Sequence, residues 1–188
     1  MPIDIPQPST PLPSAPAKLR ILETADRLFY EDGIRSVGVD RLIGESSVTK
    51  ATFYKHYGSK DRLITDYIAH RHRREAEHLA ELAARDDDPL RMLEAIRDAI
   101  ARQISSPGFR GCPFINAATE FPDPRHPVRV AVQEHREWFV DVLERLVRAL
   151  HHPMPGEAAD DLTLARDGAM TGGYAGDPVP PRPHWTAP

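Results

Sequence analysis

Positive charge and hydrogen-bonding side chains gather between Val48 and Lys60. This window contains Lys50, Lys55 and Lys60 together with His56, and it contains no acidic residue. Lysine amines neutralise phosphate oxygens, while hydroxyl and imidazole groups can reach both phosphates and base edges. The formal net charge of the whole chain is −4, which argues against a protein that coats nucleic acid over its entire surface. The window therefore predicts a local nucleic-acid contact.

Three short helices are expected to position these side chains. Apolar residues recur at helical spacing from Ala17 until Gly33, which is placed to cap the first helix. A second helix is predicted over residues 39–46, and Thr49 offers a capping hydroxyl for a third over residues 50–57. The tight link between the second and third helices is typical of a helix-turn-helix, in which the third helix enters the major groove.

The third helix has the two faces that this role requires. Phe53 supplies the docking face, with Val48 and Tyr57 beside it. The opposite face carries side chains that can contact DNA: Lys50, Thr52, Tyr54, Lys55 and His56.

The rest of the chain also predicts helices. Ser59 is expected to cap a fourth helix, which runs to the break at residues 86–89. Further helices are expected over residues 89–105, 114–120, 127–150 and 157–171. No segment shows strand alternation, so the predicted class is all-α: a three-helix DNA-binding domain, then a helical bundle. The expected divisions are a disordered proline-rich leader (1–16), the helix-turn-helix domain (17–62), a helical domain (63–176) and a disordered proline-rich tail (177–188).

The segment SSVTKATFYKHYGSKDRL, residues 46–63, resembles the signature of the tetracycline-repressor (TetR) family. The likeness extends from about Leu19 to Ile68. One departure lies in the turn, where Ser47 replaces the usual glycine and implies slight strain. The resemblance implies phosphate contacts from Tyr54 and Lys60, and base or phosphate contacts from the other residues of the set: Thr49, Lys50, Thr52, Lys55 and His56.

The same resemblance implies that residues 63–176 form an effector-binding and dimerisation domain, and it implies a function. It predicts a transcriptional repressor, not an enzyme, that binds palindromic operator DNA as a homodimer and is released by an unknown small-molecule effector. One helix of the family's usual dimer interface is expected near the end of the chain, contributed by Leu162, Leu164, Ala165, Ala169 and Met170.

A second segment, GCPFINAATEFPDPRHPVR at residues 111–129, resembles part of the effector domain in one branch of these regulators. Nearby aromatic residues are candidates for an apolar ligand pocket, with a simple hydrophobic core as the equal alternative. They are Phe109, Phe114, Phe121, Trp138 and Phe139.

Other chemistry receives little support. Cys112 has no neighbouring Lys or His in sequence to activate it, and we expect an inert thiol. The histidines at 70, 72, 78, 151 and 152 lack the spacing of a helical metal site, so we interpret them as surface residues and predict no metal, cofactor or catalytic residue. Two alternatives stay open: a helical ligand-binding or catalytic protein that uses Cys112, and a truncated regulator with impaired dimerisation, suggested by the proline-rich tail.

Location is predicted from what the chain lacks. No apolar run approaches the length of about 20 residues that spans a bilayer, and the first residues lack the basic start and apolar stretch of a secretory signal. Cys112 is the single cysteine and cannot form an internal disulfide. These features favour a cytoplasmic protein without a membrane partner.

Overall fold

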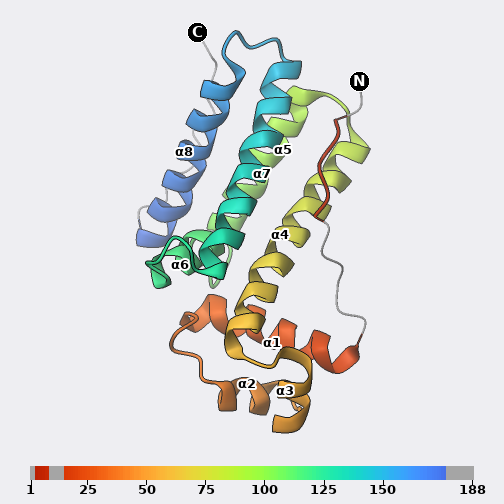
Figure 1. Cartoon of the computed structure of the whole chain (residues 1–188). Coiled ribbons are helices and arrows are strands. Elements are labelled where there is room, and N and C mark those ends of the chain that lie inside the picture. Colours follow the sequence, from red (N-terminus) through yellow and green to blue (C-terminus); the bar gives the residue numbers. More distant parts are fainter. Residues whose placement is uncertain (1–2, 9–14, 177–188) are drawn as a thin grey trace. The chain divides into compact units, whose positions relative to one another are not determined.

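The computed structural model describes residues 3–8 and 15–176, and in these residues the regular structure is entirely helical (Figure 1). This confirms the predicted all-α class. The predicted disordered tail, 177–188, lies outside the described residues. The helices are α1 (Pro16–Asp32), α2 (Val39–Glu45), α3 (Lys50–Tyr57), α4 (Lys60–Arg85), α5 (Pro89–Ile104), α6 (Pro113–Glu120), α7 (Pro127–Ala149) and α8 (Pro155–Ala175).

Local capping residues set the limits of the first helices. The backbone N–H of Gly33 donates to the Phe29 carbonyl at 3.2 Å, and its φ of 88° allows the chain to leave α1 abruptly. The Thr49 hydroxyl accepts from the backbone N–H of Thr52 at 3.1 Å and caps α3. Ser59 does the same for Arg62 at 3.2 Å. These caps confirm the ends predicted for α1, α3 and α4.

The chain divides into two compact units that do not follow a single boundary along the sequence. One unit contains α1, α2, α3, α4 up to His78, α6 and the first part of α7 up to Glu137. The other contains the end of α4, α5, the later part of α7 and α8, together with the N-terminal residues up to Ile5. Among the described residues, no helix combines the length and the apolarity needed to cross a membrane.

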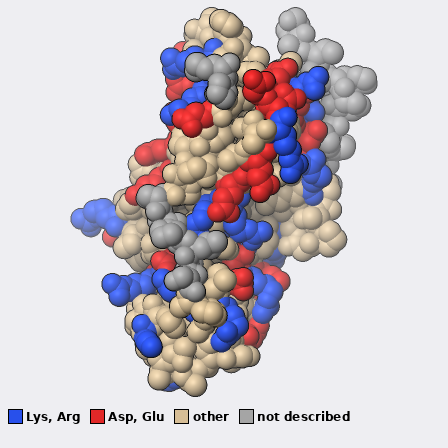
Figure 2. Space-filling view, turned by 90° about the vertical axis from the view of Figure 1, so that its right-hand side faces the viewer, with Lys and Arg blue, Asp and Glu red and all other residues tan. Residues whose placement is uncertain are grey.

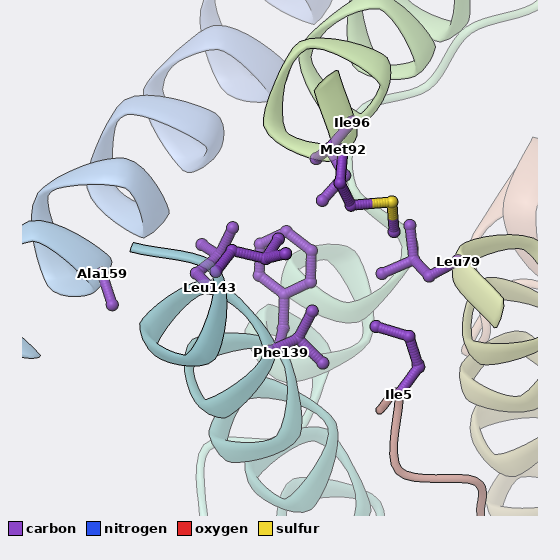
Figure 3. Packing of buried hydrophobic residues seen from close by; sticks show 9 residues of the cluster. Ile5, Leu79, Met92, Ile96, Phe139, Leu143 and Ala159 are labelled. Atoms are coloured by element: carbon purple, nitrogen blue, oxygen red, sulfur yellow. The ribbon is translucent and has the colours of Figure 1, made fainter. Parts of the chain in front are cut away.

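Apolar side chains from four helices form the core of the second unit (Figure 3). Phe139 and Leu143 of α7 lie among Met92 of α5 and Leu79 of α4, and Ala159 joins from α8. Ile5 also points into this cluster and is only 7% exposed. The prediction of a fully disordered leader is therefore wrong at Ile5. Burial of this apolar side chain is favourable and stabilises one position of the residues beside it.

Helix α8 is longer than predicted, because Gly172 and Gly173 continue it instead of ending it. Gly173 faces α5 so closely that a β-carbon there would lie 2.5 Å from Cγ2 of Ile104.

Two of the α8 residues predicted to form the dimer interface pack within the single chain instead: Met170 is buried, and Leu162 packs against the apolar cluster. Leu164, Ala165 and Ala169 are exposed.

In the first unit, α4 holds α1 by an ion pair and aromatic packing. The Arg71 guanidinium pairs with the Asp26 carboxylate, and its Nη2 donates to the Asp26 carbonyl at 3.1 Å. The rings of Phe29 and Tyr67 meet edge to face, with centroids 5.5 Å apart. Helices α2 and α3 both contact α1. The contacts between α4 and α1 therefore also position α3.

Candidate nucleic-acid interface

Helix α3 is anchored by one face and exposes the other. Phe53 and Tyr57 are buried, and the Tyr57 hydroxyl donates to the Lys18 carbonyl of α1 at 3.0 Å. On the outer face, Thr49, Lys50, Tyr54 and Lys55 are exposed and Thr52 and His56 are half-buried. Six of the seven predicted contact residues therefore lie together on or beside the face of α3 that points away from its support.

The two threonines at the start of α3 also contact each other. Their hydroxyl oxygens lie 2.8 Å apart, while the Thr49 oxygen accepts from the Thr52 backbone N–H. This pairing restricts both side chains before any ligand arrives. It places one hydroxyl pair at the helix N-terminus, where groups that contact phosphate oxygens are favourably placed.

Lys60 is the exception in the predicted set. Its Nζ donates to the Ile34 carbonyl at 2.5 Å and lies 5.8 Å from the centroid of the Phe29 ring. Partial burial lowers the pKa of Lys60, and the negative charges of Glu120 and Asp61 oppose that shift. The amine thus binds the protein itself, and a phosphate would have to compete with the carbonyl for its protons.

The turn between α2 and α3 shows the strain expected from its sequence. Ser47 adopts a φ of 53°, a left-handed conformation that favours glycine. Neighbouring hydrogen bonds hold it there: the buried Ser46 hydroxyl donates to the Leu42 carbonyl at 2.6 Å, and the Val48 N–H donates to the Ile43 carbonyl at 3.4 Å.

Acidic residues on the nearby surface of α1 and α2 are paired with arginines. Glu45 accepts from Arg27 and Arg41, and these hydrogen bonds lower the pKa of its carboxyl group. Arg41 also pairs with Asp32 at 2.7 Å. On the face drawn in Figure 2, basic side chains are dispersed over the helix-turn-helix end instead of forming one continuous patch.

The predicted aromatic pocket residues fall in different units. Phe139 is part of the apolar core, and its ring lies 6.3 Å from that of the half-buried Trp138. Phe109 is half-buried in the same unit. Phe114 and Phe121 belong to the first unit, where Phe121 stacks on His126. The rings of Phe121, Trp138 and Phe139 therefore have packing partners of their own, and the pocket stays a prediction.

Histidines that the sequence suggests are superficial take part in the interior of the first unit. His70 is 9% exposed, and Nδ1 of the half-buried His72 lies 3.0 Å from Nδ1 of His135. Phe114 stacks on the His135 ring at a centroid distance of 3.4 Å. The surface assignment is thus wrong for His70 and His72: the His72 ring contacts α7, and the His70 side chain is buried. His78, His151 and His152 are exposed, as predicted.

Cys112 also has a partner that local sequence does not suggest. The Arg166 Nη1 group, from α8, donates to its sulfur at 3.6 Å, and the Arg166 guanidinium lies 4.9 Å from the Phe139 ring centroid. The thiol itself is buried. Among the described residues, no cluster of His, Cys, Asp or Glu has an arrangement that could hold a metal ion.

Comparisons with known proteins agree with this arrangement. Residues 21–67 match the model of the bacterial regulatory proteins of the tetR family, and residues 89–152 match a tetracyclin repressor-like C-terminal domain. A TetR-family transcriptional regulator from Streptomyces coelicolor has 41% sequence identity and a TM-score of 0.82, over 86% of each chain. The chain belongs to the TetR family. It is therefore a transcriptional regulator with a helix-turn-helix DNA-binding domain.

Two more distant proteins extend the comparison. The regulator LmrA of Bacillus subtilis is 27% identical over 122 residues, which are 63% of this chain and 65% of LmrA, so the chain spans slightly less than two thirds of that relative. NemR of E. coli, in its reduced form, shares the fold with a TM-score of 0.80 at 18% identity, over 88% of this chain and 91% of NemR. This helical fold is thus also found in a protein of low sequence identity.

Proposed function

We propose that this TetR-family regulator is a cytoplasmic repressor that binds palindromic operator DNA as a homodimer and releases it when a small-molecule effector binds. The observation that carries the proposal is the outer face of α3. It presents Lys50, Tyr54 and Lys55 to solvent, while the buried ring of Phe53 holds the helix against its support. A helix built this way can enter a major groove and contact both phosphates and base edges.

A second copy is needed because one such helix reads only one half-site. Helix α8 offers a surface for it. Ala165, Gly168, Ala169 and Ala175 are exposed at helical spacing, and the neighbouring Leu164 is 68% exposed. We name Ala165, Gly168, Ala169 and Ala175 the small-residue face of α8. Small side chains let two helices approach closely, and an exposed leucine on the same face gains from being covered.

The DNA-binding part of the proposal is tested by selecting duplexes from a random pool with the full chain. We expect enrichment of an inverted repeat whose half-site centres lie about 34 to 36 Å apart, one helical turn. The logarithm of the binding constant for the selected duplex should fall linearly as the logarithm of salt concentration rises. Lys55→Ala should reduce that affinity, whereas Arg85→Ala at the far end of α4 should not. Enrichment of no sequence, or of sites without two-fold symmetry, would refute the proposal.

The effector part has its own test. The chain contains two tryptophans, so Trp138→Phe leaves Trp185 as the only such fluorophore. Compounds that dissociate the protein–DNA complex should change the fluorescence of the wild type and leave that of Trp138→Phe unaltered. An effector that dissociates DNA without any effect on Trp138 fluorescence would place the binding site elsewhere. If no compound in a broad apolar screen releases DNA, the effector proposal fails.

A catalytic or ligand-binding role centred on Cys112 is the alternative, and the Arg166 contact is the observation in its favour. The two roles are separable. Cys112→Ser should leave selection of DNA unchanged if the chain is a regulator of the proposed kind. Loss of a hydrolase or redox activity in that variant, with no DNA selected by the wild type, would favour the alternative instead.

A further inference from the structure

The motif at residues 111–129 contains a carboxylate that contacts the DNA-binding domain. Glu120, the last residue of α6, accepts from two successive backbone amides: Oε1 from Ile34 at 2.8 Å and Oε2 from Arg35 at 2.7 Å. Both oxygens are engaged, and hydrogen bonds to an ionised acceptor are stronger than those between neutral groups. The two partners are 86 and 85 residues away in sequence, so this is a tertiary contact.

The amides that Glu120 binds belong to the turn between α1 and α2. Gly33 ends α1, and after it the chain must find new acceptors for its N–H groups. The Ile34 side chain is buried and its carbonyl accepts from Lys60, at the start of α4. Two helices thus hold this turn. Glu120 of α6 accepts from the turn's amides, and Lys60 of α4 donates to its carbonyl. Even the glycine is close, since a β-carbon at Gly33 would lie 3.4 Å from Glu120 Oε1.

Other residues of the motif keep Glu120 in position. Phe114 and Ala117, on the same helix, are buried, and Phe114 stacks on His135 of α7. Directly after Glu120, the Phe121 carbonyl accepts from Arg129 of α7 at 3.1 Å. The Arg35 guanidinium lies 5.7 Å from the Phe121 ring centroid and adds a second contact between the same two segments.

We propose that Glu120 is a positioning residue for DNA recognition, which fixes the α1–α2 turn against α6 and so sets the orientation of α2 and α3. The proposal rests on the DNA binding put forward above. It assigns a purpose to the second motif: any change in the packing of α6 around Phe114 is passed by the carboxylate to the backbone that precedes α2. Loss of the contact leaves α3 packed on α1, but the turn that leads into α2 is no longer held in one position.

The test compares variants on the selected duplex. Glu120→Gln has nearly the same shape, but its amide NH₂ meets a backbone N–H where an oxygen accepted before, so one of the two bonds must break. We expect Glu120→Gln to lower DNA affinity about 5- to 150-fold, the usual range for coupling between sites. In the DNA-free protein, the Ile34 and Arg35 amides should exchange with solvent faster in this variant than in wild type.

Two controls separate positioning from general loss of stability. Glu134→Gln removes an exposed carboxylate from α7 and should change neither affinity nor exchange. Ala117→Gly weakens α6 while leaving the carboxylate in place. If the two variants have the same melting temperature, Ala117→Gly should bind DNA more tightly than Glu120→Gln does.

Three results would overturn the inference. They are unchanged exchange at Ile34 and Arg35 in Glu120→Gln, wild-type affinity in that variant, and an equal loss of affinity in Ala117→Gly at matched stability. Failure of the wild type to select any duplex is a different result, because it refutes the proposed function itself and this inference with it.

Discussion

Lys60 belongs to the predicted DNA contacts, but its amine is already engaged within the fold. Its amine donates to the Ile34 carbonyl, whereas the Lys55 amine belongs to an exposed side chain on α3. We expect Lys60→Ala to lower both DNA affinity and the free energy of unfolding, the latter by about 1 kcal/mol for the lost hydrogen bond. Lys55→Ala should lower DNA affinity alone and reduce the salt slope by about 0.9 if it neutralises one phosphate.

Urea unfolding and salt-dependent DNA titration of both variants check this prediction. If Lys60→Ala keeps wild-type stability, the bond to the Ile34 carbonyl contributes nothing. If it also keeps the wild-type salt slope, the phosphate contact implied by the family resemblance is wrong as well.

Ser47 pays a conformational cost in the turn before α3. Its φ of 53° is unfavourable for a residue with a β-carbon by about 1–2 kcal/mol, whereas glycine adopts it without strain. Glycine also makes the unfolded chain more flexible, which offsets part of the gain. We therefore expect Ser47→Gly to raise the free energy of unfolding by roughly 0.5–1 kcal/mol, measured by thermal melting. A lower melting temperature would mean that the serine side chain makes a compensating contact.

Single residues were predictable from sequence where their role is local. The caps at Thr49 and Ser59 depend on residues three positions away, and the strain at Ser47 follows from the turn itself. Glu120 was not identified, because its partners are about 85 residues away and nothing near it in sequence marks it as a hydrogen-bond acceptor for a backbone turn. Burial of His70 was missed for the same reason.

At the scale of elements, the packing of α8 on α5 depends on one residue that lacks a side chain. A β-carbon at Gly173 would lie 2.5 Å from Ile104 Cγ2, and a β-branched side chain cannot easily turn that atom aside. Although alanine favours a helix by about 1 kcal/mol over glycine, overpacking typically costs 1–3 kcal/mol. We expect Gly173→Ala to be neutral or destabilising, by up to about 2 kcal/mol in urea unfolding.

Gly168→Ala is the matched control on the same helix. A β-carbon there meets nothing within 4 Å, so only the gain in helix propensity remains. The control should therefore raise the free energy of unfolding, by up to about 1 kcal/mol. Equal stabilisation by both substitutions would show that α5 and α8 do not pack as closely as described.

We expect the histidines at positions 70 and 72 of α4 to make the stability of the first unit sensitive to pH. Burial lowers the pKa of His70 and of His72 from 6.5, with Arg73 adding to the effect on both. Below about pH 6.5 the unfolded chain binds protons that the folded chain resists, so stability is complete above this value and is lost as the pH falls toward the folded-state pKa values. If both rings at the His72–His135 contact were protonated, two N–H donors would face each other.

We therefore expect the melting temperature to fall between pH 7 and pH 5. His72→Gln should reduce this fall, whereas His78→Gln, on the exposed side of the same helix, should not. A melting temperature independent of pH in this range would contradict the prediction. An identical fall in wild type and His72→Gln would assign the effect to other groups.

Helix positions were predicted well because amphipathic spacing and capping residues are local signals. The limits of α3 agree with the prediction at both ends, and those of α1 and α2 agree within one residue. The end of α8 was placed four residues too early, because Gly172 and Gly173 resemble a break. Only the proximity of Ile104 shows that a side chain at position 173 would be crowded inside that helix.

For the whole molecule, the sequence predicted the fold class but not how the chain is divided into units. The expected boundary after residue 62 follows the chain, whereas the compact units exchange segments: α6 joins α1–α3, and Ile5 joins α5, α7 and α8. Composition made the leader look disordered because prolines exclude regular structure. It could not reveal that one isoleucine between them has a hydrophobic core to enter.

Dimerisation is the property of the whole molecule on which operator binding depends. The small-residue face presents Ala165, Gly168 and Ala169 to solvent, and in the single chain Gly168 has open space around it. Inside a close helix–helix interface that space is filled by the second copy. Gly168→Ala should thus stabilise the isolated chain while weakening the dimer, an opposite pair of effects that no simple folding defect produces.

Sedimentation at low micromolar concentration measures the dimer, and titration of the selected duplex measures its consequence. Helix α8 alone provides a smaller interface than a pair of helices from each chain would. We therefore expect the wild-type dimer to dissociate on dilution and its apparent DNA affinity to fall with it. Gly168→Ala should shift this fall to higher protein concentration. Gly156→Ala, at the start of α8 and also in open space, should not. A tight dimer that is unaffected by Gly168→Ala would place the pairing surface elsewhere, because an interface that excludes α8 has no contact with the added methyl group.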